Sequence, residues 1–258
     1  MVQTIERVST IFEVMATSAQ GISLKELSAK VGLPKGTTHR LLTSLAYFGY
    51  VRQLPESKDY CLGFKLVELG NRLLDHLDLR AQARPFLISL CKKTKETVHL
   101  VILDQNDALY VDKVVSDDNP AGLQMVSRVG RRVPAHCSAV GKVLLAQLSE
   151  QEMQALIHEK GLEKRTENTI TNTEKLKHHL KVIYRQGYAV DDEENESGIR
   201  CVGAPIFNQQ GQAIAAISIS GPTLRITKKI IQETLKNEVM KTASDISKEF
   251  GYQVSRLI

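Results

Sequence analysis

The sequence lacks an apolar run long enough to cross a membrane as a helix. Such a helix needs about 18 or more consecutive apolar residues, and every apolar stretch here is shorter. The N-terminal segment also lacks the apolar core of a signal peptide. Hydrophobic residues make up 42% of the chain and mean hydropathy is −0.17, as in globular proteins. We therefore expect a cytoplasmic protein with no membrane partner.

Cysteine is also scarce, and none of the cysteines forms a C-x-x-C pair. This scatter favours reduced thiols over a disulfide framework or a structural zinc site. A nucleotide-binding loop is absent as well, because the Gly-Lys pair at 141–142 lacks the glycine and the hydroxyl residue that the motif requires around it. We predict no metal and no cofactor. The four cysteines are Cys61, Cys91, Cys137 and Cys201.

The clearest positive signal is residues 23–52, which read as a helix-turn-helix followed by a β-wing. Ser23 and Glu26 have the spacing of a reciprocal capping box at a helix start, and Gly32 ends that helix. Pro34 suits the opening of a second helix, because its missing N–H would be unpaired there in any case. The run after Gly49 alternates, turns at 55–57 and returns as a short hairpin. A generic helical pair with a hairpin is the alternative.

The second helix has the outward face of a DNA-reading helix. A helical projection turns its leucines inward, and the opposite face carries hydroxyls, one arginine and a histidine, with no acid between Lys35 and Tyr47. Residues 24–65 hold seven Lys and Arg against three acids, within a net charge of +5. This local excess suits phosphate contacts. We predict base contacts from Thr37, His39, Arg40 and Thr43, phosphate contacts from Lys35 and Arg52, and close backbone approach at Gly36.

The remaining chain is long enough for a second domain with its own core. Periodicity predicts a linker helix over 64–79 and then a mixed domain, so we expect an α+β protein with domains 1–63, 64–80 (linker) and 81–258. The expected helices are 84–95, 138–147, 149–160, 173–187 and 227–250. The expected strands are 97–103, 108–115, 122–129, 199–207 and 213–220.

The linker helix predicts self-association. Its leucines form an apolar stripe that is too long for a free connector, and two-fold pairing of recognition helices would read a palindromic site. We therefore expect a homodimer or homotetramer on double-stranded operator DNA. The stripe is formed by Leu66, Leu69, Leu73 and Leu77.

Three segments of the second domain look suited to a ligand: 130–142, 191–201 and 216–222. A helix starting at Ser138–Gly141 would offer unpaired N–H groups to a carboxylate without a buried cation. Ser218 and Ser220 alternate along a strand, so both hydroxyls face one side, which Cys201 could share. Asp191 would accept a hydrogen bond from a ligand hydroxyl or amide, or belong to a solvated acidic loop.

Across residues 2–254 the chain resembles the IclR family of bacterial transcription regulators. The resemblance lies in KGTTHRLLTSLAYFGYV, YCLGFKLVELG, VPAHCSAVGKVLLA, GYAVDDEENESGIRCVGAPIF and AISISGPTLRIT, in this order. It implies a winged helix-turn-helix, a linker helix and a GAF-like α/β effector-binding domain. It also implies a pocket formed by the backbone of Ala139 and Val140, the side chains of Asp191, Cys201, Ser218 and Ser220, and apolar walls from Met125, Val133 and Ile199.

The sequence thus predicts a ligand-responsive repressor without catalytic activity, which senses a small anionic metabolite. Several segments resemble the branch of the family that responds to sugar-acid catabolites such as 2-keto-3-deoxygluconate. Two alternatives remain open. One is a thiol-based redox sensor using Cys137 and Cys201, and the other is a bifunctional enzyme with a DNA-binding head.

Overall fold

The computed structural model describes residues 2–18, 20–75, 78–116 and 127–253. The chain divides into two compact units, Met1–Leu77 and Asp78–Ile258. No helix within the described ranges is both long and apolar enough to cross a membrane.

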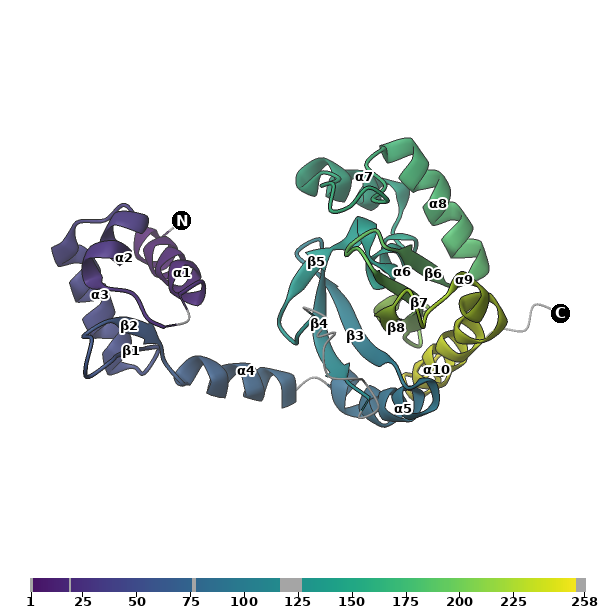
Figure 1. The fold of residues 1–258 in the computed structure, drawn as a ribbon, viewed down its shortest axis with the longest axis horizontal. Helices are drawn as coiled ribbons and strands as arrows, with labels where there is room; N and C mark the ends of the chain where they lie inside the picture. Colours follow the sequence, from purple (N-terminus) through teal and green to yellow (C-terminus); the bar gives the residue numbers. More distant parts are fainter. Residues whose placement is uncertain (1, 19, 76–77, 117–126, 254–258) are drawn as a thin grey trace. The chain divides into compact units, whose positions relative to one another are not determined.

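The first unit is a small helical domain with a two-stranded antiparallel wing (Figure 1). Its buried core joins the first helix, the helix-turn-helix and the wing through Ile11, Leu27, Leu42, Val51 and Tyr60. The first helix was not expected from the sequence. The elements are α1 (Gln3–Ala16), α2 (Leu24–Lys30), α3 (Lys35–Tyr47), β1 (Val51–Gln53), β2 (Tyr60–Leu62) and α4 (Lys65–Asp75).

The helix-turn-helix begins and ends where the sequence predicts. Ser23 Oγ accepts a hydrogen bond from Glu26 N at 3.2 Å, but the Glu26 carboxylate turns forward to Lys30 Nζ at 2.8 Å. Only half of the expected capping box is therefore present. Gly32, with φ of +66°, takes a left-handed conformation that favours glycine, and Pro34 is the N-cap of α3.

The predicted linker helix 64–79 is helical from Lys65 on wherever it is described, but the next helix begins earlier than expected. Helix α4 ends at Asp75 and α5 starts at Asp78, before the expected start at Arg84 and with Pro85 inside it. On α4, Leu69 and Leu73 are exposed apolar side chains, whereas Leu66 is half-buried. Leu77 lies outside the described residues.

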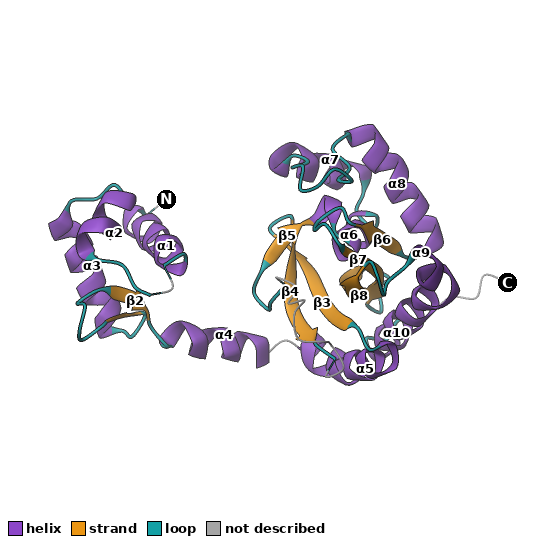
Figure 2. Cartoon of the chain, in the orientation of Figure 1, coloured by secondary structure: helices purple, strands orange, loops and turns teal. Residues whose placement is uncertain are grey.

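The second unit is built on a six-stranded antiparallel sheet in the order β5-β4-β3-β8-β7-β6. Figure 2 shows this sheet with helices around it. The strands are β3 (Thr97–Asp104), β4 (Asp107–Val114), β5 (Arg132–Pro134), β6 (Ala189–Asp192), β7 (Ile199–Phe207) and β8 (Ala213–Pro222). Strands β5 and β6 were not expected.

The expected strand at 122–129 is not formed by its described residues. Residues 122–126 lie outside the described ranges, and residues 127–129 are irregular. The physical reason is a turn at Gly130, where φ is +84° and the N–H donates to Tyr110 O at 2.8 Å. Regular ladder pairing with β4 begins at Arg132.

Helices cover both faces of the sheet. Helix α5 (Asp78–Thr94) packs against β3 and β4 and against α10 (Lys236–Glu249), which contacts β7 and β8. Helix α6 (Ala139–Leu145) contacts the sheet separately and is followed outward by α7 (Glu150–Lys160) and α8 (Thr173–Gln186). The predicted terminal helix 227–250 is formed as α9 (Lys228–Ile230), a π-helical turn (Ile231–Leu235) and α10.

Two glycines let the start of α6 approach its neighbours closely. A Cβ on Gly141 would lie 2.3 Å from Ala135 O, so this position cannot carry a side chain without backbone movement. A Cβ on Gly203 of β7 would lie 3.3 Å from both Ala139 C and Val140 N. The backbone at the start of α6 therefore lies directly over β7.

Candidate functional site

Helix α3 presents the predicted polar face to solvent. Gly36, His39, Arg40 and Thr43 are exposed, as is Lys35, while Thr37 is half-buried. Thr38 and Leu42 are buried on the opposite side. Thr43 Oγ1 donates to His39 O at 2.9 Å, so its hydrogen is already engaged and the hydroxyl oxygen is what remains for an incoming donor.

The wing places Arg52 beside an exposed aromatic ring. Arg52 is exposed on β1, and its guanidinium carbon lies 5.2 Å from the centre of the Phe64 ring. This cation–π contact limits the conformations of the arginine while leaving its donors in solvent. Such an arginine can contact a phosphate at a reduced entropic cost.

The second unit contains a cavity of about 270 Å³ between the sheet, the start of α6 and residues 191–196. All predicted effector residues within the described ranges line it, whereas Met125 lies outside those ranges. The predicted residues that line the cavity are Val133, Ala139, Val140, Asp191, Ile199, Cys201, Ser218 and Ser220.

Strand register explains why residues distant in sequence share this cavity. Asp191 pairs with Cys201, which pairs with Ser220, and these three side chains form one row across the sheet. In the next row Ser218 pairs with His99. A period of two along β8 keeps Ser218 and Ser220 on the same face, as predicted.

His99 is a cavity residue that the sequence reasoning missed. Its Nδ1 lies 3.3 Å from Ser220 Oγ and 3.5 Å from Ser218 Oγ, and its Nε2 lies 2.9 Å from Ser127 Oγ. Burial lowers the pKa of His99 to about 3, so the ring is neutral and offers one donor and one acceptor. The alternating pattern of the predicted strand 97–103 was the available signal.

Asp191 is buried rather than part of a solvated loop. Its Oδ1 accepts hydrogen bonds from Glu194 N at 2.7 Å and from Asn195 N at 3.3 Å. Burial, only partly offset by Lys142, raises the pKa of Asp191 to about 7. Near neutral pH this carboxyl group is therefore close to the midpoint of its titration and can donate as well as accept.

The start of α6 supplies backbone donors to the cavity wall. Ser138 Oγ accepts from Gly141 N at 3.2 Å, which occupies one of the free donors of the first turn. Within the described part of the chain, no protein hydrogen bond engages the N–H of Ala139 or Val140, and both residues line the cavity.

Two arginines that the sequence analysis did not single out line the cavity, and neither of them is buried. These are Arg131 and Arg165, and the fully buried Lys142 lies on α6. The sequence did not reveal these cations because the two arginines come from irregular segments and Lys142 sits in an apolar run. The lining thus combines two arginines, hydroxyls and a neutral imidazole with the carboxyl groups of Asp191 and Glu196, a set that can bind a small ligand carrying both a carboxylate and hydroxyl groups.

The thiols of the cavity region are poorly suited to redox chemistry. Burial raises the pKa of Cys137 to about 12, and burial raises that of Cys201 well above its ordinary value. Both groups are therefore held as thiols, whereas the thiolate is the reactive form. Among the described residues, no cluster of His, Cys, Asp and Glu could hold a metal ion.

Sequence comparison identifies two family domains in this chain. The IclR helix-turn-helix domain matches residues 4–55, and the domain described as bacterial transcriptional regulator IclR C-terminal matches residues 71–248. The transcriptional regulator KdgR of Escherichia coli is 40% identical over 232 residues, which cover 90% of this chain and 86% of KdgR. The E. coli regulator XynR is 35% identical over 252 residues, 98% of each chain.

Solved structures show the same architecture. The IclR protein of Thermotoga maritima superposes with a TM-score of 0.79 at 34% identity, covering 98% of this chain and all of that one. The C-terminal domain of E. coli KdgR matches with a TM-score of 0.61 at 37% identity, covering 68% of this chain and 100% of that domain. With a helix-turn-helix that exposes an acid-free face and an α/β unit that encloses a polar cavity, this chain belongs to the IclR family of bacterial transcriptional regulators.

Proposed function

We propose that the protein is a repressor of a catabolic operon that releases its operator when a small anionic metabolite fills the cavity of the second unit. The observation that carries this proposal is the joint presence of an exposed, acid-free reading face on α3 and a polar cavity lined by hydroxyls and two arginines. The protein acts on double-stranded DNA in the cytoplasm, as a homodimer or homotetramer and without catalysis.

In this proposal Thr37, His39, Arg40 and Thr43 contact base edges, with Gly36 allowing close backbone approach. Lys35 and Arg52 contact phosphates. Both groups project from one small domain, so the phosphate contacts can fix the register in which the base contacts are made.

The effector is proposed to be a keto acid or sugar acid. A cavity of about 270 Å³ is at the small end of ligand pockets, which span about 300–1,000 Å³, and this suits a compact metabolite. The N–H groups of Ala139 and Val140 and the hydroxyls of Ser218 and Ser220 would hold the carboxylate and neighbouring oxygens. The resemblance to the sugar-acid branch makes 2-keto-3-deoxygluconate the first candidate.

Redox sensing is the weaker alternative, because the buried Cys137 and Cys201 are held as thiols. A thiol titration before and after peroxide, run beside an operator-binding assay, tests it directly. Metabolite sensing predicts that peroxide leaves operator affinity unchanged.

Genome-wide mapping of DNA occupancy tests the main proposal. We expect the protein at few sites, beside genes for uptake or degradation of an organic acid. Purified protein should then release those sites on addition of 2-keto-3-deoxygluconate or a related acid, and should not release them with the corresponding neutral sugar. Occupancy spread evenly over the chromosome, or release by the neutral sugar alone, would contradict the proposal.

A further inference from the structure

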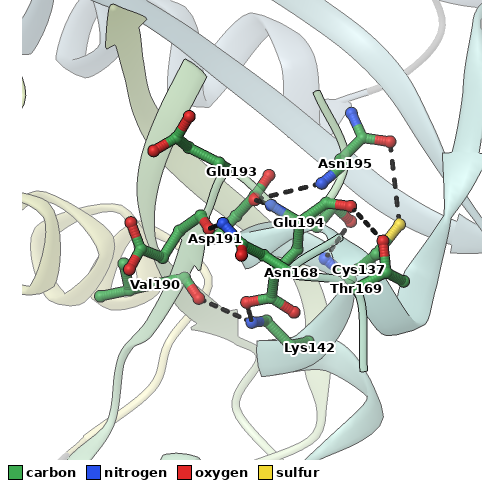
Figure 3. A network of polar contacts seen from close by, with 12 residues as sticks. Cys137, Lys142, Asn168, Thr169, Val190, Asp191, Glu193, Glu194 and Asn195 are labelled. Atoms are coloured by element: carbon green, nitrogen blue, oxygen red, sulfur yellow. Dashed lines mark hydrogen bonds and ion pairs between the residues drawn. The ribbon is translucent and has the colours of Figure 1, made fainter. Parts of the chain in front are cut away.

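A fully buried lysine lies beneath the cavity of the second unit. Lys142 on α6 is 0% exposed. Its Nζ donates to Val190 O at 2.6 Å and forms an ion pair with Glu194 Oε1 (Figure 3). Because a buried charge is strongly unfavourable without a partner, Lys142 requires this carboxylate in the folded state.

Glu194 is in turn held by contacts of both its backbone and its side chain. Its backbone N–H donates to Asp191 Oδ1 at 2.7 Å, and its carbonyl accepts from Thr169 Oγ1 at 2.6 Å. The side chain reaches α6 from this fixed backbone, as Figure 3 shows. Glu194 therefore connects the segment 191–198 to α6 through its side chain, and to the loop that contains Thr169 through its carbonyl.

The two elements joined by this pair both contribute lining residues to the cavity. Helix α6 contributes Ala139 and Val140 less than a turn before Lys142, and the acidic segment contributes Asp191, Asn195 and Glu196. Neither Lys142 nor Glu194 is among the residues that line the cavity. Their contact can nevertheless set the distance between two of its walls.

We propose that Lys142 and Glu194 are positioning residues of the effector site, whose buried ion pair holds the segment 191–198 against α6 so that Asp191, Asn195 and Glu196 face the ligand. This inference rests on the proposed effector function of the cavity. In this role the Lys142–Glu194 pair affects ligand affinity, although neither residue contacts the ligand.

The charges around Asp191 provide a signature of this arrangement. Lys142 of α6 lowers the pKa of Asp191, whereas Glu194 raises it by repulsion. The other titratable or charged groups around this site are His99 on β3, Tyr110 on β4, Arg131, Cys137 before α6, Arg165, Glu196 on the acidic segment and Cys201 on β7. Removing the charge of Lys142 should therefore raise the pKa of Asp191, and removing the charge of Glu194 should lower it.

Hydrogen exchange of the full-length protein tests the positioning role without any ligand. We would compare wild type with Lys142→Met and Glu194→Gln, the second of which keeps shape and should fold even if the first does not. We expect the amides of Glu194 and Asn195 to exchange at least about tenfold faster in both variants, because their hydrogen bonds to Asp191 depend on this segment staying in place.

The matched control is Glu96→Gln, which alters another buried carboxylate of the same unit. Glu96 is 7% exposed and pairs with Arg225 at 2.6 Å, and neither residue lines the cavity. Unchanged exchange at Glu194 and Asn195 in Glu194→Gln, or an equal increase in Glu96→Gln, would overturn the proposal.

Calorimetric titration with 2-keto-3-deoxygluconate between pH 5.5 and 8.5 adds a readout that simple destabilisation would not move. We expect affinity to fall at least about fivefold in both variants, and the pH midpoint of binding to rise in Lys142→Met and to fall in Glu194→Gln. Midpoints that move in the same direction would overturn the positioning role. If the wild type does not bind this acid, the proposed ligand fails, and hydrogen exchange alone decides the role of the pair.

Discussion

The hydroxyl oxygens of Ser218 and Ser220 lie 3.3 Å apart on β8, and both approach Nδ1 of the neutral His99. The two hydroxyls thus share one imidazole nitrogen as a partner. Hydrogen-bonding positions on the hydroxyls therefore remain available to a ligand in the cavity. The proposed effector would occupy these positions.

Replacing both serines with alanine should weaken the effector response by about 1–3 kcal/mol, because ligand oxygens would lose their partners. Operator affinity in the absence of ligand should not change. The measurement is the midpoint of operator release against candidate keto and sugar acids, with Ser244→Ala on α10 as the control. An unchanged midpoint in the double variant would place the ligand elsewhere.

Arg40 is predicted to read a base. Arg40→Ala should cost roughly 1–3 kcal/mol of specific binding and leave binding to random DNA less affected. Paired titrations of operator and random duplex at one salt concentration distinguish the roles. Equal losses would reassign Arg40 to phosphate, and no loss on either duplex would refute a groove contact.

Asp191 should make the stability of the second unit depend on pH. Its folded pKa of about 7 exceeds the ordinary 3.8, so the folded state binds the proton more tightly. This contribution is fully present below about pH 4 and is lost as pH rises to 7. Relative to Asp191→Asn, the wild type should lose about 3 kcal/mol of unfolding free energy between pH 4.5 and 7.5.

Urea unfolding of both proteins at the two pH values measures this difference. The asparagine can still accept from the amides of residues 194 and 195, so it is a fair reference. Parallel pH profiles for the two proteins would show that Asp191 titrates normally.

The exposed apolar side chains of α4 should support self-association. Val67, Leu69 and Leu73 are 57%, 40% and 66% exposed, which is unfavourable for a helix that remains in water. Sedimentation at micromolar concentration should give a dimer or larger species, and Leu69→Lys with Leu73→Lys should weaken it. A wild-type monomer that binds a palindromic operator tightly would contradict this prediction.

Gly141 should not tolerate even a methyl group. Gly141→Ala places a Cβ 2.3 Å from Ala135 O and should destabilise the second unit by about 2–3 kcal/mol. Gly70→Ala on α4 has open space and should stabilise its helix by about 0.5–1 kcal/mol. Thermal unfolding followed by circular dichroism compares the two, and changes of the same sign would refute the packing argument.

Local signals predicted much of this fold. The turn around Gly32 and Pro34, and the alternation that places Ser218 and Ser220 on one face, depend only on neighbouring residues, and both are confirmed. Helix α1 was missed because its N-cap, Val2, provides no side-chain hydrogen bond. The start of α5 was placed too late because Pro85 has the character of a first-turn residue but lies inside the helix.

Features set by contacts between distant residues were not accessible. Strand β6 is short, and its pairing with β7 defines it more than its own composition does. Arg131 and Arg165 reach the cavity from irregular segments far apart in the chain, so no local pattern placed them together. The partner of Lys142 lies 52 residues away, so no local pattern indicated a buried ion pair.

The DNA-reading unit and the cavity unit each have a hydrophobic core of their own. Substitutions in the lining of the cavity should therefore leave intact the hydrophobic core on which α3 packs. In a genetic screen, substitutions at the effector residues should accordingly be recovered as non-inducible alleles, which keep the operon silent in the presence of its substrate. In mixed oligomers with wild-type chains, such alleles should be dominant.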